Sequence, residues 1–124
     1  MKSDIRLNNS ELKIMNILWE REALSAKEIS LEAAARHGWN KNTTYTILKG
    51  LVEKEYIRRD EPNFICTPLL AIDSVRRWET RGLIDRLFGG SPGAFLSTFF
   101  EQENLTGKEL ADILKIIDGE VGQK

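Results

Sequence analysis

The fold is decided by residues 39–54, which read WNKNTTYTILKGLVEK. Four side chains recur here at the spacing i, i+3, i+4, i+7, which places them on one face of a helix: Thr44, Ile47, Leu48 and Leu51. At about 100° per residue, five others must lie on the opposite, outward face: Asn42, Tyr45, Thr46, Lys49 and Glu53. With residues 39–42 as the turn that leads into it, the pattern predicts a helix with one buried face and one exposed polar face.

Two more helices are predicted before this one, over residues 9–21 and from residue 25 to about residue 37. Each begins with a polar residue that a glutamate follows three positions later, as in a capping box: Asn8 with Glu11, and Ser25 with Glu28. Gly38 is a suitable end for the second helix. Residues 22–24 are expected to be a short link.

A hairpin is predicted after the third helix, with strands over residues 56–59 and 64–67 and a turn over residues 60–63. Three helices followed by two short strands indicate a winged helix-turn-helix. Pro68 marks its edge, so we expect a winged-helix domain over residues 1–69.

Residues 70–124 are predicted to form three further helices, over about 71–88, over about 94–102 and from Thr106 onward, with a break at the GGSPG stretch 89–93. Their apolar surface is too large for about 50 residues to bury alone, so a second copy of the chain is expected to cover it. The expected dimer contacts are Val75, Trp78, Leu83, Leu87, Phe95, Phe99, Leu110, Ile113, Leu114 and Ile117. The fold class is therefore mainly α with a small β-hairpin wing, followed by a helical dimerisation domain.

Composition excludes several classes of protein. With 124 residues the chain is too short for a large catalytic scaffold. No apolar run approaches the roughly 18 residues of a membrane span, and the N-terminus lacks the apolar core of a signal peptide, so a cytoplasmic protein without membrane insertion is expected. Cys66 is the single cysteine, which fits a reducing compartment.

The charges suggest two electrostatic characters. The formal net charge is −1, but residues 36–59 hold six basic and two acidic residues, whereas residues 71–124 hold seven basic and nine acidic residues. The first stretch suits phosphates, and the second suits a protein partner.

Candidates for catalysis are few. His37 is the single histidine and stands at a predicted helix end, where a surface role is more common than a catalytic one. Cys66 has no other cysteine or histidine at a ligand spacing, so neither a metal site nor a cofactor is expected. Residues 89–93 lack the lysine and the preceding strand of a phosphate-binding loop.

Binding to double-stranded DNA accounts better for the polar residues. A helix-turn-helix places its second helix, here the third of the domain, in the major groove. Asn can pair with adenine, Thr can meet a phosphate or a thymine methyl, and Lys can reach guanine or phosphate. The expected DNA contacts are Lys41, Asn42, Thr43, Tyr45, Thr46 and Lys49 from the helix, with Arg58 and Arg59 from the wing. The alternative is that these residues form an ordinary solvated surface.

Residues 39–54 also resemble the recognition helix of the BlaI/MecI penicillinase-repressor family. Residues 12–19 look like that family's first helix, residues 25–29 like its second, and residues 87–90 like the break in its dimerisation segment. The resemblance implies a homodimer on palindromic operators and repression of genes such as those for β-lactamases. It also implies release when a membrane-bound sensor protease triggers cleavage within the dimerisation segment.

The chain departs from this family at three places. Gly50 stands where an arginine is frequent. Thr98 and Phe99 stand where the staphylococcal repressors are cut between an asparagine and a phenylalanine, so this pair is the candidate cleavage region. The C-terminal Cys-x-Cys pair of copper-responsive relatives is missing, so copper sensing is not expected.

The sequence therefore predicts a homodimeric, sequence-specific transcriptional repressor. Two rivals stay open: a winged-helix protein-interaction module that does not bind DNA, and an enzyme.

Overall fold

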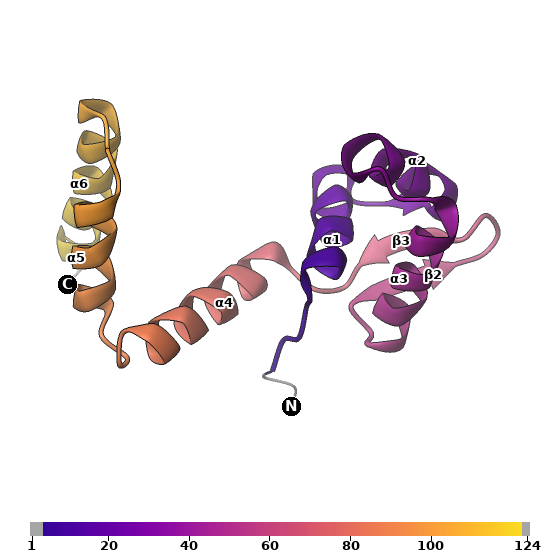
Figure 1. Cartoon of the computed structure of the whole chain (residues 1–124), viewed down its shortest axis with the longest axis horizontal. Coiled ribbons are helices and arrows are strands. Elements are labelled where there is room, and N and C mark those ends of the chain that lie inside the picture. Colours follow the sequence, from indigo (N-terminus) through magenta and orange to yellow (C-terminus); the bar gives the residue numbers. More distant parts are fainter. Residues whose placement is uncertain (1–3, 123–124) are drawn as a thin grey trace. The chain divides into compact units, whose positions relative to one another are not determined.

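A computed structural model describes residues 4–122 (Figure 1). The described residues divide into two compact units, with the boundary between residues 79 and 80. The elements are α1 (Asn9–Arg21), β1 (Leu24–Ser25), α2 (Ala26–His37), α3 (Lys41–Glu53), β2 (Ile57–Asp60), β3 (Ile65–Pro68), α4 (Ile72–Leu87), α5 (Pro92–Gln102) and α6 (Gly107–Gly122). The mainly α fold with a β-hairpin wing is confirmed.

Both predicted capping boxes are present. The Asn8 side chain accepts a hydrogen bond from the Glu11 backbone N–H at 2.8 Å, and Glu11 accepts from the Asn8 N–H at 2.9 Å. Ser25 and Glu28 make the same reciprocal pair at 3.1 and 3.0 Å. Because these bonds satisfy free N–H groups in the first turn, they fix where α1 and α2 begin.

The third helix begins earlier than predicted. Asn40 caps α3, since its side-chain oxygen accepts from the Thr43 N–H at 2.8 Å. Lys41 and Asn42, predicted as part of the turn, therefore form the first residues of the helix. A side-chain cap at Asn40 leaves only residues 38–40 to connect α2 to α3.

The sheet has a strand that the sequence did not reveal. All strand pairs are antiparallel in the order β1-β3-β2. In β1, Leu24 was expected in a link and Ser25 at the start of a helix, but Leu24 pairs with Cys66 and Ser25 with Ile65. Two residues are too few to show the alternation by which a strand is recognised.

The wing strands each start one residue later than predicted. The Tyr56 N–H donates to the Leu51 carbonyl at 3.0 Å and so belongs to the turn that follows α3. Phe64 has a φ of 50°, in the left-handed region, and belongs to the turn.

The core of the first unit lies between its three helices and the sheet (Figure 1). Its fully buried side chains include Ile14, Ile17 and Leu18 of α1, Ile29 of α2, Leu48 and Leu51 of α3, and Ile57 and Cys66 of the sheet. Cys66 is completely buried. The residues that hold α3 in place are thus the apolar ones that the sequence predicted.

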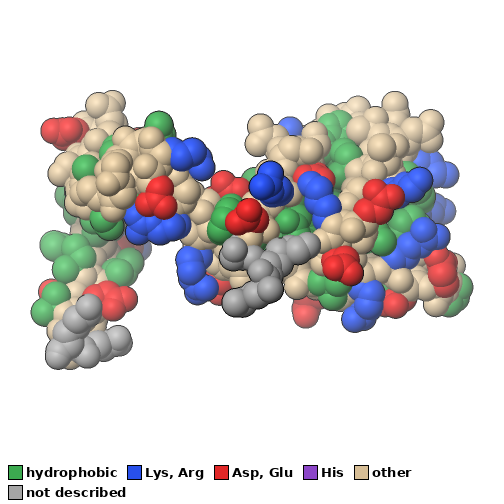
Figure 2. Space-filling model, turned by 90° about the horizontal axis from the view of Figure 1, so that it is seen from below, with side chains coloured by type: hydrophobic (Ala, Val, Ile, Leu, Met, Phe, Trp, Pro, Cys, Tyr) green, Lys and Arg blue, Asp and Glu red, His purple; other side chains and the backbone are tan. Residues whose placement is uncertain are grey.

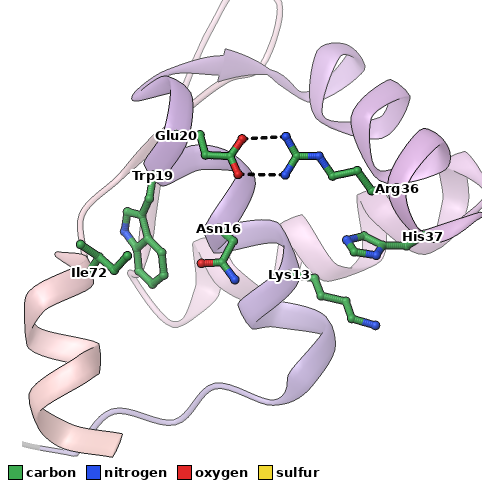
Figure 3. A pocket seen from close by; sticks show the side chains of 7 residues that line it. All are labelled: Lys13, Asn16, Trp19, Glu20, Arg36, His37 and Ile72. Atoms are coloured by element: carbon green, nitrogen blue, oxygen red, sulfur yellow. Dashed lines mark hydrogen bonds and ion pairs between the residues drawn. The ribbon is translucent and has the colours of Figure 1, made fainter. Parts of the chain in front are cut away.

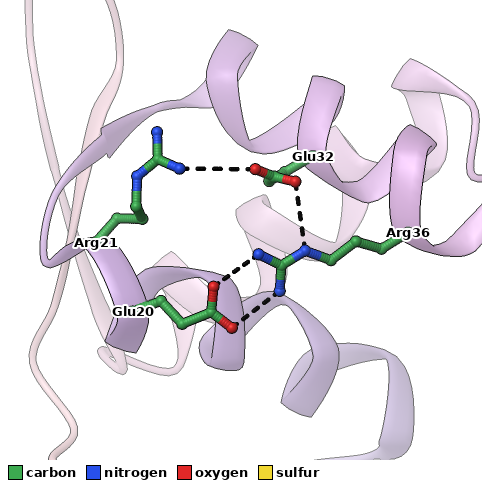
Figure 4. Close-up of polar contacts among 4 residues, drawn as sticks. All are labelled: Glu20, Arg21, Glu32 and Arg36. Carbon is green, nitrogen blue, oxygen red and sulfur yellow. Dashed lines mark hydrogen bonds and ion pairs between the residues drawn. The ribbon is translucent and has the colours of Figure 1, made fainter.

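A network of charges fastens α2 to α1 (Figure 4). The Arg36 guanidinium donates two hydrogen bonds to the Glu20 carboxylate, at 2.6 and 3.0 Å, and a third to Glu32 at 3.3 Å. Arg21 approaches Glu32 at 3.7 Å. The bonds from Arg36 hold the pKa of the Glu20 carboxyl below its usual range.

The second unit has little core of its own. Helix α5 begins at Pro92, two residues before the predicted start, because Ser91 caps it and proline suits the first turn. Thr106 and Glu109 form a further capping box at the predicted start of α6, with hydrogen bonds of 2.8 and 3.1 Å. No described residue of α5 or α6 is buried. Among residues 4–122, no helix is both long and apolar enough to cross a membrane.

Candidate nucleic-acid interface

The outward face of α3 carries exposed polar side chains. Thr44, Leu48 and Leu51 are buried on the inner face. The exposed side chains are Lys41, Asn42, Thr43, Thr46, Lys49 and Glu53. The predicted division into two faces is therefore confirmed for these residues, and the exposed set presents amide, hydroxyl and ammonium groups to the surroundings.

Tyr45 does not point fully outward, which corrects the prediction. It is half-buried, and its ring meets the Phe64 ring edge-on with 6.0 Å between the ring centres. The Nζ atom of Lys41 lies 5.6 Å from the centre of the Tyr45 ring. A side chain this large at the border of the two faces covers the edge of the core.

The basic residues between positions 36 and 59 differ in their electrostatic surroundings. Four of the six contact carboxylates: Arg36 with Glu20 and Glu32, Lys54 with Glu11, Arg58 with Asp60, and Arg59 with Glu61. For Lys41 and Lys49 the described part of the chain provides no carboxylate within 4.0 Å. The unneutralised positive charge of this stretch therefore lies on α3. Figure 2 shows one face of the chain, on which acidic and basic side chains of the winged unit lie side by side.

The wing presents its two arginines in different ways. The Arg58 Nε lies 3.0 Å from the Asp60 carboxylate, and both side chains are about half exposed or more. The Arg59 Nε lies 2.7 Å from Glu61, and its guanidinium carbon lies 3.9 Å from the centre of the Phe64 ring. Only Arg59 thus contacts both a carboxylate and a ring.

A hollow of about 460 Å³ opens beside α1 (Figure 3). Lys13, Asn16, Trp19, Glu20, Arg36, His37 and Ile72 line it. His37, the catalytic candidate, packs its ring against Trp39 with 5.2 Å between the ring centres. The described lining holds no serine, threonine or cysteine, and its one carboxylate, Glu20, is bonded to Arg36.

The structure places the predicted dimer contacts in three groups. Val75 is buried within the single chain, at 4% exposure. The half-buried ones are Leu83, Phe95, Phe99 and Ile113, and the exposed ones are Trp78, Leu87, Leu110, Leu114 and Ile117. Four large exposed side chains of these helices lie outside the predicted set of dimer contacts: Leu96, Phe100, Ile116 and Val121. Figure 2 shows hydrophobic side chains on the surface of the second unit.

Thr98 and Phe99, the candidate cleavage region, lie inside α5. Thr98 is exposed, whereas Phe99 is half-buried and packs its ring 6.3 Å from that of Phe95 and 5.7 Å from that of Phe100. The bond between them is therefore part of a regular helix.

Comparison with known proteins gives consistent results. The family model described as "Penicillinase repressor" matches residues 7–119. The penicillinase repressor of Bacillus licheniformis is 21% identical over 100% of this chain and 98% of its own length. The penicillinase repressor of Staphylococcus aureus is 24% identical over 92% of both chains, and the methicillin resistance regulatory protein MecI of Staphylococcus aureus strain N315 is 24% identical over 90% of this chain and 93% of its own.

Two solved structures share the fold of the winged unit. The solution structure of the DNA-binding domain of the repressor BlaI superposes with a TM-score of 0.54 at 22% identity, covering 60% of this chain and 93% of that one. The monomeric form of Bacillus licheniformis BlaI in complex with the blaP half-operator gives a TM-score of 0.51 at 22% identity, with the same coverage.

Proposed function

The chain belongs to the penicillinase repressor family, and from that premise we propose that it is a non-catalytic transcriptional repressor that binds operator DNA as a homodimer. The single observation that carries the proposal is the outer face of α3, where polar side chains surround two lysines that have no described carboxylate partner. In the winged-helix fold this helix is the one that enters the major groove.

The proposed base contacts come from the centre of that face. The Asn42 amide can pair with adenine. Thr46 can contact a thymine methyl through its own methyl group or a base through its hydroxyl, and the Lys49 ammonium can donate to guanine. Lys41 and Thr43, in the first turn of the helix, suit phosphates on either side of the groove. Arg58 would add a phosphate contact from the wing after exchanging its exposed Asp60 partner for the DNA backbone.

The dimer is proposed from the apolar surface of the second unit. On α6 the exposed side chains Leu110, Leu114, Ile117 and Val121 follow the spacing i, i+4, i+7, i+11, which is one continuous stripe along the helix. These four side chains are 43–68% exposed, and leaving so long an apolar stripe in contact with water is unfavourable in free energy. A second copy offers the same stripe, and a two-fold dimer would present two α3 helices to the two halves of a palindromic operator.

Two features of the regulation are proposed as well. The relative from Bacillus licheniformis is named a penicillinase repressor. We propose that this chain acts in the cytoplasm and that its target genes are of that resistance type. Cleavage at Thr98–Phe99 by a sensor protease system would require α5 to unwind locally, because a protease binds extended backbone and this bond is helical.

The test is selection of bound DNA from a random pool with the full-length chain, followed by mobility shifts on the enriched sequences. The proposal expects enrichment of a two-fold symmetric sequence and a bound species with two chains. Recovery of no sequence preference at low salt would contradict it and would favour a winged helix that binds protein instead.

A further inference from the structure

The two neighbouring wing arginines lie on opposite faces of the hairpin. In the register of β2 and β3, Arg59 pairs with the buried Cys66 and Arg58 pairs with Thr67. Because side chains alternate along a strand, Arg59 lies on the core side of the hairpin and Arg58 on the outer side. Sequence reasoning had assigned the same role to both.

The contacts of Arg59 lead from the wing to α3. Its guanidinium stacks on the Phe64 ring at 3.9 Å, the Phe64 ring meets the Tyr45 ring edge-on at 6.0 Å, and Lys41 lies over the Tyr45 ring at 5.6 Å. We name these four residues, Arg59, Phe64, Tyr45 and Lys41, the wing-helix stack. Each distance lies within the range of cation–π or aromatic pair contacts.

The backbone at Phe64 adopts an energetically unfavourable conformation. Its φ of 50° is unfavourable for a bulky residue and persists only where the surroundings enforce it. The Phe64 carbonyl also accepts the Ala26 N–H at 2.9 Å, at the first residue of α2. The ring of Phe64 is therefore fixed at the junction of the wing, α2 and α3.

We propose that Arg59 is a positioning residue for DNA binding, which holds the wing against the recognition helix through Phe64 and Tyr45, and that of the two wing arginines only Arg58 contacts a phosphate. The inference rests on the proposed function. The Arg59 guanidinium is held by two contacts, the Glu61 carboxylate and the Phe64 ring. The Arg58 guanidinium is held by one, the Asp60 carboxylate.

The chain offers a matched pair of variants that test this division. Arg59→Met with Glu61→Gln removes the inner ion pair without changing the net charge, and methionine can still pack on Phe64. Arg58→Met with Asp60→Asn makes the same change on the outer face. Affinity for the selected operator is measured over a range of salt concentrations, and thermal unfolding checks that each variant is folded.

The outer double variant is expected to lower the slope of log affinity against log salt by about 0.9, the value for one phosphate contact. The inner double variant is expected to keep the wild-type slope and to stay within about fivefold of the wild-type affinity, the range of one exposed cation–π contact. A loss of slope in the inner variant would overturn the inference.

A second measurement tests the coupling through Phe64. Arg59→Ala, Phe64→Leu and the double variant are compared in operator binding. If Arg59 acts through the ring, the double variant loses no more affinity than the weaker-binding single variant; if Arg59 contacts DNA independently, the two losses multiply. Should the wild-type chain bind no DNA, the proposed function itself fails, whereas operator binding with multiplying losses overturns only the role of Arg59.

Discussion

The ammonium group of Lys54 lies 2.8 Å from the carboxylate of Glu11, whose side chain is only 9% exposed. Glu11 also accepts the Asn8 N–H as part of the α1 capping box, and Lys54 also donates to the Arg6 carbonyl at 3.0 Å. One ion pair thus connects the start of α1 to the end of the recognition helix.

Replacing Lys54 with methionine should lower the free energy of unfolding by about 1–2 kcal/mol, because Glu11 stays buried without its cationic partner. Urea denaturation measures the change. Lys27→Met, on the exposed side of α2, is the control and should have little effect. In a Glu11→Gln background the loss from Lys54→Met should shrink; equal losses in both backgrounds would show that the pair contributes nothing.

Gly50 lies inside α3, and no atom lies within 4 Å of the position that a Cβ would take there. Gly50→Ala should raise the free energy of unfolding by about 0.5–1 kcal/mol by restricting the unfolded chain. Gly50→Arg should give comparable stability, and its added positive charge should also give tighter operator binding. Equal DNA affinity for the alanine and arginine variants would mean that position 50 does not reach the DNA.

The proposed dimer can be tested with two leucines of nearly equal exposure, Leu114 on α6 at 60% and Leu31 on α2 at 62%. Leu114→Gln should raise the dimer dissociation constant at least about tenfold, since a leucine buried at an interface contributes ~1.5–3 kcal/mol. Leu31→Gln should leave it unchanged. Sedimentation equilibrium measures both, and equal effects would contradict the proposed stripe on α6.

Burial raises the pKa of the Cys66 thiol to about 11, above its value of about 8.5 in an unfolded chain. Below pH ~8.5 the thiol is protonated in both states; as the pH rises from there towards 11, only the unfolded state loses the proton, so stability falls. The urea midpoint should therefore fall more steeply over this range in the wild type than in Cys66→Ala. Parallel pH curves would contradict the assignment.

Local signals in the sequence were enough to predict most helix positions. Asn8 and Ser25 each form a capping box with the glutamate three residues later. The start of each of these helices, α1 and α2, is therefore encoded within a stretch of four residues. The apolar spacing of Leu48 and Leu51 likewise defined the inner face of α3, because it repeats with the period of the helix.

Contacts between distant residues could not be predicted in this way. In the sequence Arg36 adds one positive charge to residues 36–59. In the structure the packing of α2 on α1 places Glu20 beside Arg36, so that charge is paired. Similarly, Tyr45 reads as an outward residue until the wing turn places Phe64 beside it. Strand β1, which was not predicted from the sequence, is recognised only through its pairing with β3.

The central claim is that the outer face of α3 reads bases, and the ratio of specific to nonspecific DNA affinity tests it most directly. Wild type, Thr46→Ala and Lys49→Ala are titrated against the selected operator and against scrambled DNA at one salt concentration. We predict that each alanine variant loses at least about tenfold on the operator, as expected for a base contact worth ~1–3 kcal/mol, and much less on scrambled DNA. Equal losses on both DNAs would contradict the claim.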